Sequence, residues 1–505
     1  MDPSERQAEV IVIGSGNAAF SAALTAREQG SRVLMLEKGS TEWVGGNSWF
    51  TAGAYRLVHR GLADLAGLIE PPDGEIELPA YSAADYEADM RRVTHEQCDP
   101  ELTRILVTEA RDAAAWMQAQ GVRWRLMVER QSHLSGGRIR FYGGLAVGTA
   151  GGGVGLIEAY RAAARVADVE LRVGSPVEEI VVNQGTVTGV RVRTSEGALT
   201  LRAKAVVLAS GGFEANRELR GRHLGPTWSL ASVRGTPHNT GEALLAAIAI
   251  GAQPFGQWDG CHAIAWDAAA PPHGDRDLSN RYSRQAYPYG MVVNVCGERF
   301  VDEGADFRNY TYAKYGAEIL NQPRSLAFQL FDAKTIGLLS LIDYSTATTS
   351  RYEADTIGDL AERAGIDRRG LEQTVSAYNA AVGSAPFNPT LLDGRRTVGL
   401  EPPKSNWAQT LDAPPYVAFA VGCGITFTFG GIRISADGAV LNATGAVIPG
   451  LFAAGETVGG LFYHNYPGGT GLAAGTVFGR RAGRSAAAHA GSRRPPRFRA
   501  GTNGR

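Results

Sequence analysis

The chain has 505 residues, of which 44% are hydrophobic and 20% are charged, as in an ordinary globular protein large enough for two or more domains. Its formal net charge of −1 excludes the basic footprint of a nucleic-acid-binding protein. No apolar run approaches the ~20 residues that cross a bilayer, so we predict no integral membrane segment. The N-terminal MDPSERQAE lacks a signal-peptide pattern and the cysteines stand singly, so we expect a cytoplasmic protein with reduced thiols.

The N-terminal segment has the order strand, glycine turn, helix, strand and acid. An apolar run at 10–13 leads into GSGNAA at 14–19 and an alanine-rich stretch, and a second apolar run at 33–36 ends on Glu37. A dinucleotide-binding fold has this order, with the acid about twenty residues beyond the glycines. Its first glycine permits the tight turn, its second lets the backbone approach a pyrophosphate, and the acid binds a ribose hydroxyl. We therefore predict a dinucleotide site here.

A second cofactor element, GLFAAGE at 450–456, lies near the other end of the chain. If both elements bind one ligand, most of the chain is threaded between two parts of a single site.

The segments between these elements alternate helical and strand patterns. A glycine turn, GGNS, stands at 45–48, and a helix is expected from the capping residue Asp99 to Gly121. GGGVG at 151–155 precedes a helical stretch at 156–167, and the alternating pattern that follows predicts a β-meander with a final strand at 205–209.

The region from 254 to 427 is richer in prolines and aromatic residues and has less regular periodicity, which predicts an inserted domain. The expected fold class is α/β (α+β overall), a Rossmann-like dinucleotide-binding domain with an inserted α+β domain. The predicted boundaries are 1–253 and 428–490 for the dinucleotide-binding domain, 254–427 for the inserted domain, and 491–505 for a disordered basic tail.

These motifs, in this order, resemble the fumarate reductase/succinate dehydrogenase flavoprotein family. The resemblance rests on GSGNAA with Glu37, GGNS, VVLASGGFEAN at 206–216, CGERFVDE at 296–303, and GLFAAGE. It implies FAD bound between a Rossmann-like domain and a mobile cap, with hydride transfer to or from a carbon beside an electron-withdrawing group. Within the family, runs at 305–316, 424–431 and 462–469 look most like tricarballylate dehydrogenase-type proteins. Covalent relatives carry a His near GGNS; none stands here, which implies noncovalent FAD.

The resemblance also implies which residues contact the cofactor, from the ADP half to the flavin edge. These are Gly14, Gly16, Asn17, Ala18, Ala19, Glu37, Lys38, Gly45, Gly46, Asn47, Ser48, Ala52, Gly53, Val177, Ser210, Gly211, Gly212, Asn216, Gly455, Glu456, Gly469, Gly471 and Leu472.

Breaking two C–H bonds requires a hydride acceptor, a base, and an electrophile for the developing enolate. Arg308, shortly after the ERFVDE run, matches the family's proton-transfer arginine with one extra residue before it; alternatively, it pairs with Asp306 or Glu303 to fix the loop. Tyr310, and after it Tyr312, are the next candidates for the base. His262 matches a substrate-binding His of the fumarate reductases, although a structural role is the usual one for a single His.

Two departures from the fumarate reductases bear on the substrate. Phe427 stands where they have a second substrate His, and the run from Tyr463 to Gly469 lacks their carboxylate-clamping Arg. Arg gives a permanently charged bidentate clamp and Tyr a single neutral donor, so this loss argues against a simple C4-dicarboxylate. Tyr466-Pro-Gly-Gly instead resembles the 3-ketosteroid dehydrogenases, in which a Tyr polarises a ketone; a packed core aromatic is the alternative.

The sequence therefore predicts an FAD-dependent oxidoreductase acting on a CH–CH group beside a carboxylate or carbonyl of a small molecule, similar to tricarballylate dehydrogenase. The alternatives are an enone-forming enzyme like 3-ketosteroid dehydrogenase, an oxygen-using flavoprotein, and a non-catalytic flavin subunit of a redox complex. Without haem or cluster motifs, electrons must pass to a separate acceptor such as quinone, a redox protein or oxygen. We expect no metal ligand set.

Overall fold

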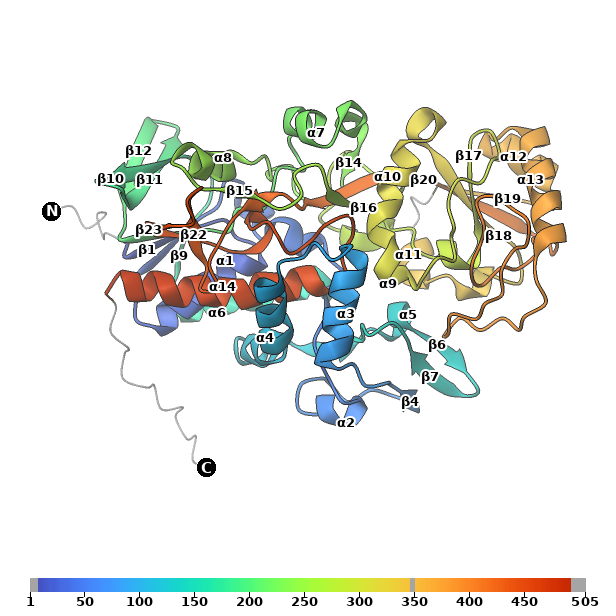
Figure 1. The fold of residues 1–505 in the computed structure, drawn as a ribbon, viewed down its shortest axis with the longest axis horizontal. Helices are drawn as coiled ribbons and strands as arrows, with labels where there is room; N and C mark the ends of the chain where they lie inside the picture. The colour runs from blue at the N-terminus through green and yellow to red at the C-terminus, as the bar shows by residue number, and fades with distance from the viewer. Residues whose placement is uncertain (1–7, 346–349, 492–505) are drawn as a thin grey trace.

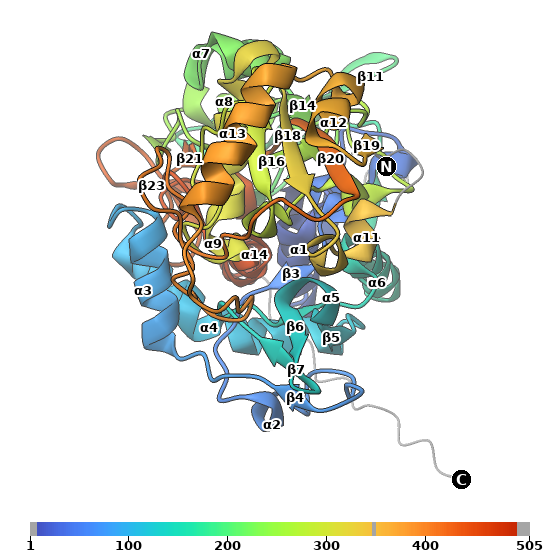
Figure 2. The same cartoon turned by 90° about the vertical axis from the view of Figure 1, so that its right-hand side faces the viewer.

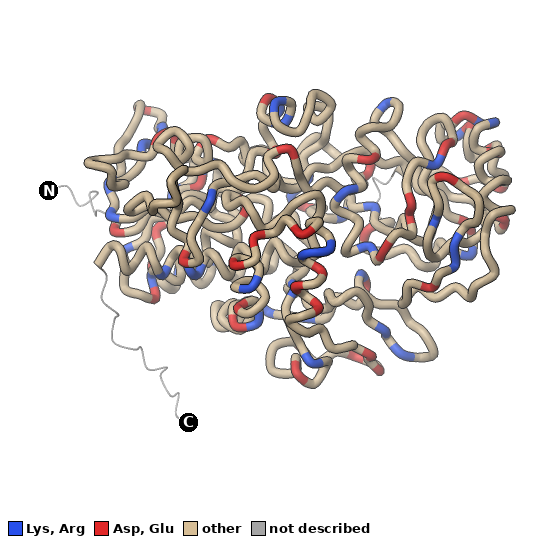
Figure 3. Tube along the Cα trace, viewed as in Figure 1, with Lys and Arg blue, Asp and Glu red and all other residues tan. Residues whose placement is uncertain are grey.

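The computed structural model describes residues 8–345 and 350–491. The predicted basic tail, apart from Gly491, lies outside these residues. Figure 1 shows two sheets at opposite ends of an elongated molecule, with the long C-terminal helix α14 (Thr470–His489) running beneath the first sheet. Acidic and basic residues are interspersed along the chain in Figure 3. Within the described residues, no helix is both long and apolar enough to span a membrane.

The first sheet has six strands in the order β22-β23-β13-β1-β2-β9, and only the edge strand β22 runs antiparallel to its neighbour. Its central strand β1 is entirely buried because helices and loops cover both faces of a parallel sheet, which explains its uninterrupted apolar sequence. The strands are β1 (Val10–Ile13), β2 (Val33–Leu36), β9 (Glu170–Arg172), β13 (Ala205–Leu208), β22 (Ala439–Leu441) and β23 (Val447–Ala453).

Helices α1 (Asn17–Glu28) and α14 lie against each other at backbone distance. A Cβ atom at Gly479 would lie 2.6 Å from the Ala18 carbonyl oxygen, and one at Gly483 would lie 2.2 Å from that of Ala22. Side chains larger than hydrogen would force the helices apart. This contact brings the N-terminal ends of both helices to the same edge of the sheet, where the Asn17 amide donates to the Leu472 carbonyl at 2.8 Å.

Smaller antiparallel sheets extend this part of the molecule. The predicted β-meander forms β10 (Val177–Asn183), β11 (Thr186–Thr194) and β12 (Gly197–Arg202). Its predicted final strand was wrongly placed, because β13 pairs in parallel with β1 and β23 in the first sheet. The other pairings involve β3 (Ala54–Tyr55), β5 (Trp124–Leu126) and β8 (Val147–Thr149); β4 (Ile76–Glu77), β6 (Ser132–Ser135) and β7 (Arg138–Phe141); and β15 (Pro254–Phe255) with β21 (Gly431–Ile432).

The second sheet, here called the cap sheet, is built around the long strand β20 (Tyr416–Thr428), which pairs with four other strands. Its other members are β14 (Ser232–Val233), β16 (Cys261–Asp267), β17 (Met291–Asn294), β18 (Ala327–Phe331) and β19 (Arg351–Ala354). Helices α12 (Ile357–Ala364) and α13 (Arg368–Ala381) pack on it through a separate apolar core (Figure 2). The sheet thus draws β14 from before residue 254, and the domain boundaries remain a prediction.

The remaining helices surround these sheets. They are α2 (Leu62–Leu65), α3 (Ala83–Val93), α4 (Pro100–Ala119), α5 (Val128–Gln131), α6 (Gly152–Val166), α7 (Arg217–His223), α8 (Glu242–Ala249), α9 (Arg308–Thr311), α10 (Tyr315–Leu320) and α11 (Leu341–Tyr344).

The mixed α/β architecture confirms the predicted fold class, and most predicted elements lie where the sequence indicates. Asp99 caps α4, accepting the N–H groups of Glu101 and Leu102 at 3.0 Å each. One helix start was wrong, because α6 begins at Gly152 and not at residue 156. The intervening glycines lie inside the helix for close contact: a Cβ at Gly153 would stand 2.1 Å from the Ser48 carbonyl oxygen.

The α1–α14 contact leads to a stability prediction. Gly483→Ala gains up to ~1 kcal/mol of helix propensity but meets the Ala22 carbonyl, and overpacking of this kind costs about 1–3 kcal/mol. We expect thermal unfolding to shift a few degrees lower. Gly221→Ala in α7, where a Cβ meets open space, is the matched control and should leave the midpoint equal or higher. An unchanged midpoint for Gly483→Ala would show that the helices can separate freely.

Candidate active site

A long cleft runs along the edge of the first sheet where α1 and α14 begin. It contains about 1420 Å³ of empty space, its open mouth included. The cleft extends from Glu37, at the end of β2, to Leu472, in the first turn of α14. Both predicted halves of the cofactor site line it. Gly455 (φ +74°) approaches α1 so closely that a Cβ there would lie 2.7 Å from the Ala18 side chain.

Most of the predicted cofactor residues line this cleft: Gly14, Gly16, Asn17, Ala18, Glu37, Lys38, Gly46, Asn47, Ser48, Val177, Ser210, Gly211, Gly455, Glu456, Gly471 and Leu472. Ala52 and Gly469 line the inner cavity described below. The remaining five, Ala19, Gly45, Gly53, Gly212 and Asn216, line neither space.

The residues outside the two spaces have other contacts. Ala19 is fully buried in α1, and the Gly45 N–H donates to the Ser15 hydroxyl at 3.0 Å. A Cβ at Gly53 would clash with Thr149, and one at Gly212 would clash with Glu456. Asn216 uses its side chain to cap α7. Their predicted cofactor contacts remain predictions.

Glu37 is buried at the adenosine end that the dinucleotide pattern predicts. Its carboxylate accepts the Gly39 N–H at 2.7 Å and the Ser15 hydroxyl. Burial raises its pKa, and these hydrogen bonds oppose the rise. The contacts fix the carboxylate at the end of β2, where it can accept a ligand hydroxyl.

A second buried carboxyl, Glu456, lies beside Glu214, a residue that the sequence did not single out. Glu456 accepts the Thr428 N–H at 2.7 Å, while the amides of Asn239 (2.6 Å) and Asn47 donate to Glu214. Burial raises the pKa of Glu456 well above its usual range, and the neighbouring Glu214 raises it further. The proximity of the two carboxyl groups and their burial therefore both favour the protonated form of Glu456.

An inner cavity of about 570 Å³ of empty space meets the cleft at Gly471 and Leu472, which line both. The hydroxyls of Tyr312 and Tyr466 form a hydrogen bond with each other at its wall. Tyr466 belongs to the segment just before α14, and a Cβ at Gly471 would lie 3.9 Å from its ring. The structure thus brings Tyr466 to the junction between the two spaces.

Three arginines from distant segments converge on the inner cavity: Arg130, Arg234 and Arg308. Arg130 forms a buried ion pair with Asp343 at 2.6 Å. Arg308 donates to the Gln285 side chain and the Arg130 carbonyl, and not to Asp306 or Glu303. Glu303 pairs with Arg299 instead. The sequence singled out Arg308 alone, because no local motif marks the other two.

His262 lies behind the inner cavity in an aromatic cluster. Its ring stacks on Phe427 at 5.1 Å and meets the edges of Tyr312 and Tyr466 at 5.0 and 4.9 Å. Neither ring nitrogen has a hydrogen-bond partner among the described residues. Burial lowers the His262 pKa well below its usual range, and Arg234 lowers it further, so the ring is neutral. In this environment His262 packs against Tyr312 and Tyr466 and helps to hold their rings in place. Its predicted contact with the substrate remains a prediction.

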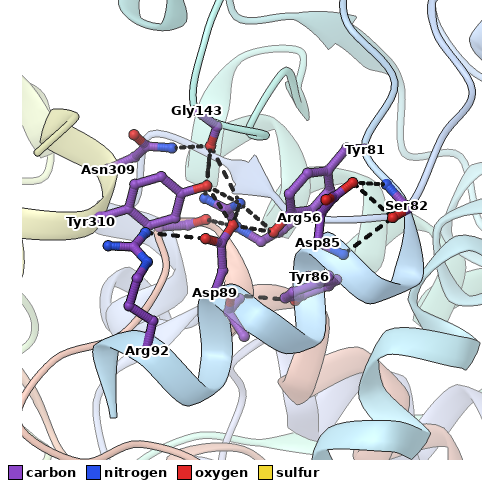
Figure 4. A network of polar contacts seen from close by, with 12 residues as sticks. Arg56, Tyr81, Ser82, Asp85, Tyr86, Asp89, Arg92, Gly143, Asn309 and Tyr310 are labelled. Carbon is purple, nitrogen blue, oxygen red and sulfur yellow. Dashed lines mark hydrogen bonds and ion pairs between the residues drawn. The ribbon is translucent and has the colours of Figure 1, made fainter. Parts of the chain in front are cut away.

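Tyr310 faces away from the inner cavity. Its hydroxyl lies 2.7 Å from the Gly143 carbonyl oxygen and contacts the Asp89 carboxylate, beside the buried Arg56 guanidinium (Figure 4). Arg56 in turn donates to the Gly468 carbonyl at 2.9 Å, close to the start of α14. Tyr310 therefore fastens the cap segment to α3, while Tyr312, two residues later, supplies the hydroxyl in the cavity.

A cleft of this kind, with both helix N-termini at one edge of a parallel sheet, is typical of a dinucleotide-binding protein. Residues 9–472 match the family model described as FAD binding domain, and the chain belongs to that family. It is 31% identical over 495 residues to "Probable fumarate reductase Ifc3" of Shewanella frigidimarina, covering 97% of this chain and 76% of the relative.

Two further comparisons agree. The chain is 26% identical over 542 residues to "3-oxosteroid 1-dehydrogenase" of Mycobacterium tuberculosis, covering 91% of this chain and 94% of the relative. The solved open conformation of a flavocytochrome c3 fumarate reductase matches with a TM-score of 0.72 and 28% identity, covering 96% of this chain and 79% of that one. These findings confirm the predicted flavoprotein family, the FAD cofactor and an FAD-dependent oxidoreductase.

The residues that line the cleft have the chemistry that FAD binding requires. It offers a buried carboxylate at one end, two helix N-termini, and glycines at which a side chain would collide with the opposite wall. Glu37, Asn47, Glu456 and the first turn of α14 would hold the cofactor. The noncovalent attachment remains a prediction. Within the described residues, no cluster of three or more His, Cys, Asp or Glu could hold a metal ion.

The buried His262 leads to a pH prediction. The unfolded chain binds a proton at this histidine below about pH 6.5, whereas the folded chain does not, so the free energy of unfolding must fall as the pH drops below that value. The effect is at most ~1.4 kcal/mol per pH unit. His262→Phe and His262→Gln should both flatten the decline between pH 6.5 and 5 in denaturant unfolding. Slopes parallel to the wild type would show that His262 titrates equally in both states.

Proposed function

We propose that the protein removes or adds two hydrogens across a C–C bond beside a carbonyl or carboxylate of a small, polar molecule. The observation that carries this proposal is the Tyr312–Tyr466 hydroxyl pair, set where the inner cavity meets the FAD cleft. When bound, FAD supplies a two-electron hydride acceptor or donor. The protein residues must then orient the substrate, polarise it and transfer a proton.

Tyr466 is suited to polarise a carbonyl oxygen. Burial raises its pKa well above the usual range and Tyr312 adds to the rise, so the hydroxyl keeps its proton and acts as a hydrogen-bond donor. The first turn of α14 lines the same cavity, and its free N–H groups favour negative charge on a nearby oxygen. These two features support stabilisation of an enolate in the manner of an oxyanion hole.

Arg308 and Tyr312 are the candidates for proton transfer. Both line the inner cavity, whereas Tyr310 does not. Tyr312 contacts Tyr466 directly, and the nearby Arg234 and Arg308 charges partly offset the burial that raises its pKa. A proton could therefore pass between the substrate and the hydroxyl pair. Arg308 lines the same cavity, contacts Gln285, and is the residue to which the family resemblance assigns proton transfer.

The polarity of the inner cavity indicates the kind of substrate. Three guanidinium groups in its wall favour a carboxylate-bearing molecule over a wholly apolar ring system. The name of one relative refers to fumarate and that of another to a 3-oxosteroid, so the family includes both carboxylate and ketone chemistry. We infer that the substrate carries a carboxylate and that its reacting C–C bond lies beside either a carboxylate or a carbonyl group. Electrons then pass to a separate acceptor such as quinone, a redox protein or oxygen.

The Tyr466 hydroxyl can be tested by substitution. Tyr466→Phe should lower kcat for anaerobic flavin bleaching, or for dye-linked turnover, by about 100-fold or more, because one preorganised donor to a developing oxyanion is worth that much. FAD content should not change. Tyr352→Phe on β19, outside both spaces, is the control and should stay within about twofold of wild type. Full turnover by Tyr466→Phe would remove this hydroxyl from the mechanism.

A further inference from the structure

Arg234, just after β14, is a buried cation that forms no ion pair with any described residue. The residue is 7% exposed and lines the inner cavity. Nε donates to the Asn280 side-chain oxygen at 2.9 Å, Nη2 contacts the same oxygen, and Nη1 donates to the Thr426 hydroxyl at 2.9 Å. Both acceptors are neutral. Among residues 8–345 and 350–491, no carboxylate oxygen lies within the 4.0 Å of an ion pair with this guanidinium.

Two N–H groups of the Arg234 guanidinium are not used by its contacts with Asn280 and Thr426. A guanidinium has five N–H groups, and the three contacts to Asn280 and Thr426 use three of them. One N–H remains on each terminal nitrogen. A guanidinium can offer an N–H group from each terminal nitrogen to the two oxygens of one carboxylate. The Ser283 hydroxyl, 2.9 Å from the Asn280 oxygen, and the Trp266 ring, 5.9 Å from the guanidinium carbon, hold the group in place.

The other charges facing the cavity do not neutralise Arg234. Asp343 pairs with Arg130, and Arg308 donates to the neutral oxygens of Gln285 and the Arg130 main chain. Burying a charge without a partner is costly, and the cost is relieved when a ligand brings the opposite charge. The cavity wall therefore carries an excess of positive charge that an anionic substrate would balance.

We propose that Arg234 is the residue that selects the substrate, by binding a carboxylate of a small oxo acid whose carbonyl oxygen contacts Tyr466. This inference rests on the proposed function for the second contact only. The charged clamp missing from the 463–469 run is then provided by a different segment, and the substrate class becomes a molecule with a carbonyl and a carboxylate on different carbons. An uncharged ketone of the same shape lacks the first contact.

The test compares short oxo acids, such as levulinate and the oxocyclohexane carboxylates, with their methyl esters. Binding is followed by the change in FAD absorption of the holoprotein, and reaction by anaerobic bleaching. In wild type, kcat/KM and affinity should be about 100-fold higher for an acid than for its ester, as expected for a buried charge pair. Arg234→Gln should remove this preference, mainly by weakening the acid, and Arg234→Lys should restore part of it.

Asn280→Asp provides a second variant with almost no change in shape. It places a carboxylate on Arg234 and should abolish the preference for acids while esters bind as before. Arg222→Gln, an exposed arginine on α7, is the matched control and should leave the preference unchanged.

Four outcomes would overturn the inference. In the wild type, these are esters that bind as tightly as acids, or no absorption change with any compound. The third is an equal loss of affinity for acid and ester in Arg234→Gln at unchanged FAD content. The fourth is an Arg234-dependent absorption change that chloride produces as strongly as the oxo acids. If acids bind in an Arg234-dependent way but none bleaches the flavin, the proposed reaction fails and the carboxylate site stands.

Discussion

The contact between α1 and α14 is the constraint on which the rest of the structure depends. Gly479 and Gly483 allow the two backbones to touch, and Asn17 bridges them by donating to Leu472. The helices come from opposite ends of the sequence, yet their N-terminal turns share one cleft. Because Leu472 also lines the inner cavity, the same contact that builds the cofactor cleft determines where the inner cavity meets it.

The cofactor cleft and the inner cavity are lined by different kinds of buried ionisable group. Carboxyl groups lie along the cofactor cleft, where Glu37 and Glu456 are desolvated and held by main-chain N–H groups. Guanidinium groups lie around the inner cavity, where Arg234 donates to the neutral oxygens of Asn280 and Thr426. Hydroxyl-rich parts of a cofactor suit the first environment and an anionic substrate the second. Tyr310, in the same short helix as Arg308, contacts both Arg56 and Asp89. These contacts fix the position of that helix beside the two spaces.

The sequence predicted the cofactor cleft well because its determinants are local. Gly14, Glu37 and Gly455 belong to short motifs whose backbone requirements are visible in the residues themselves. The inner cavity was predicted poorly because it forms by convergence. Arg130 and Arg234 belong to no recognisable motif, and Glu214 gains its importance from lying beside Glu456. Tyr310 and Tyr312 are two residues apart, and their side chains point in different directions from a short helical turn. Sequence spacing could not indicate that Tyr312 faces Tyr466 while Tyr310 faces Arg56.

We propose that one small molecule lies between Tyr466 and Arg234, beside the FAD cleft. A crystal structure of the FAD-loaded protein with a non-reactive oxo acid should show the carbonyl oxygen within hydrogen-bond distance of the Tyr466 hydroxyl and the carboxylate on the remaining N–H groups of Arg234. In that structure Tyr310 should still contact Asp89. A ligand bound in the inner cavity without contact to either Tyr466 or Arg234, or bound beside Tyr310, would contradict this proposal.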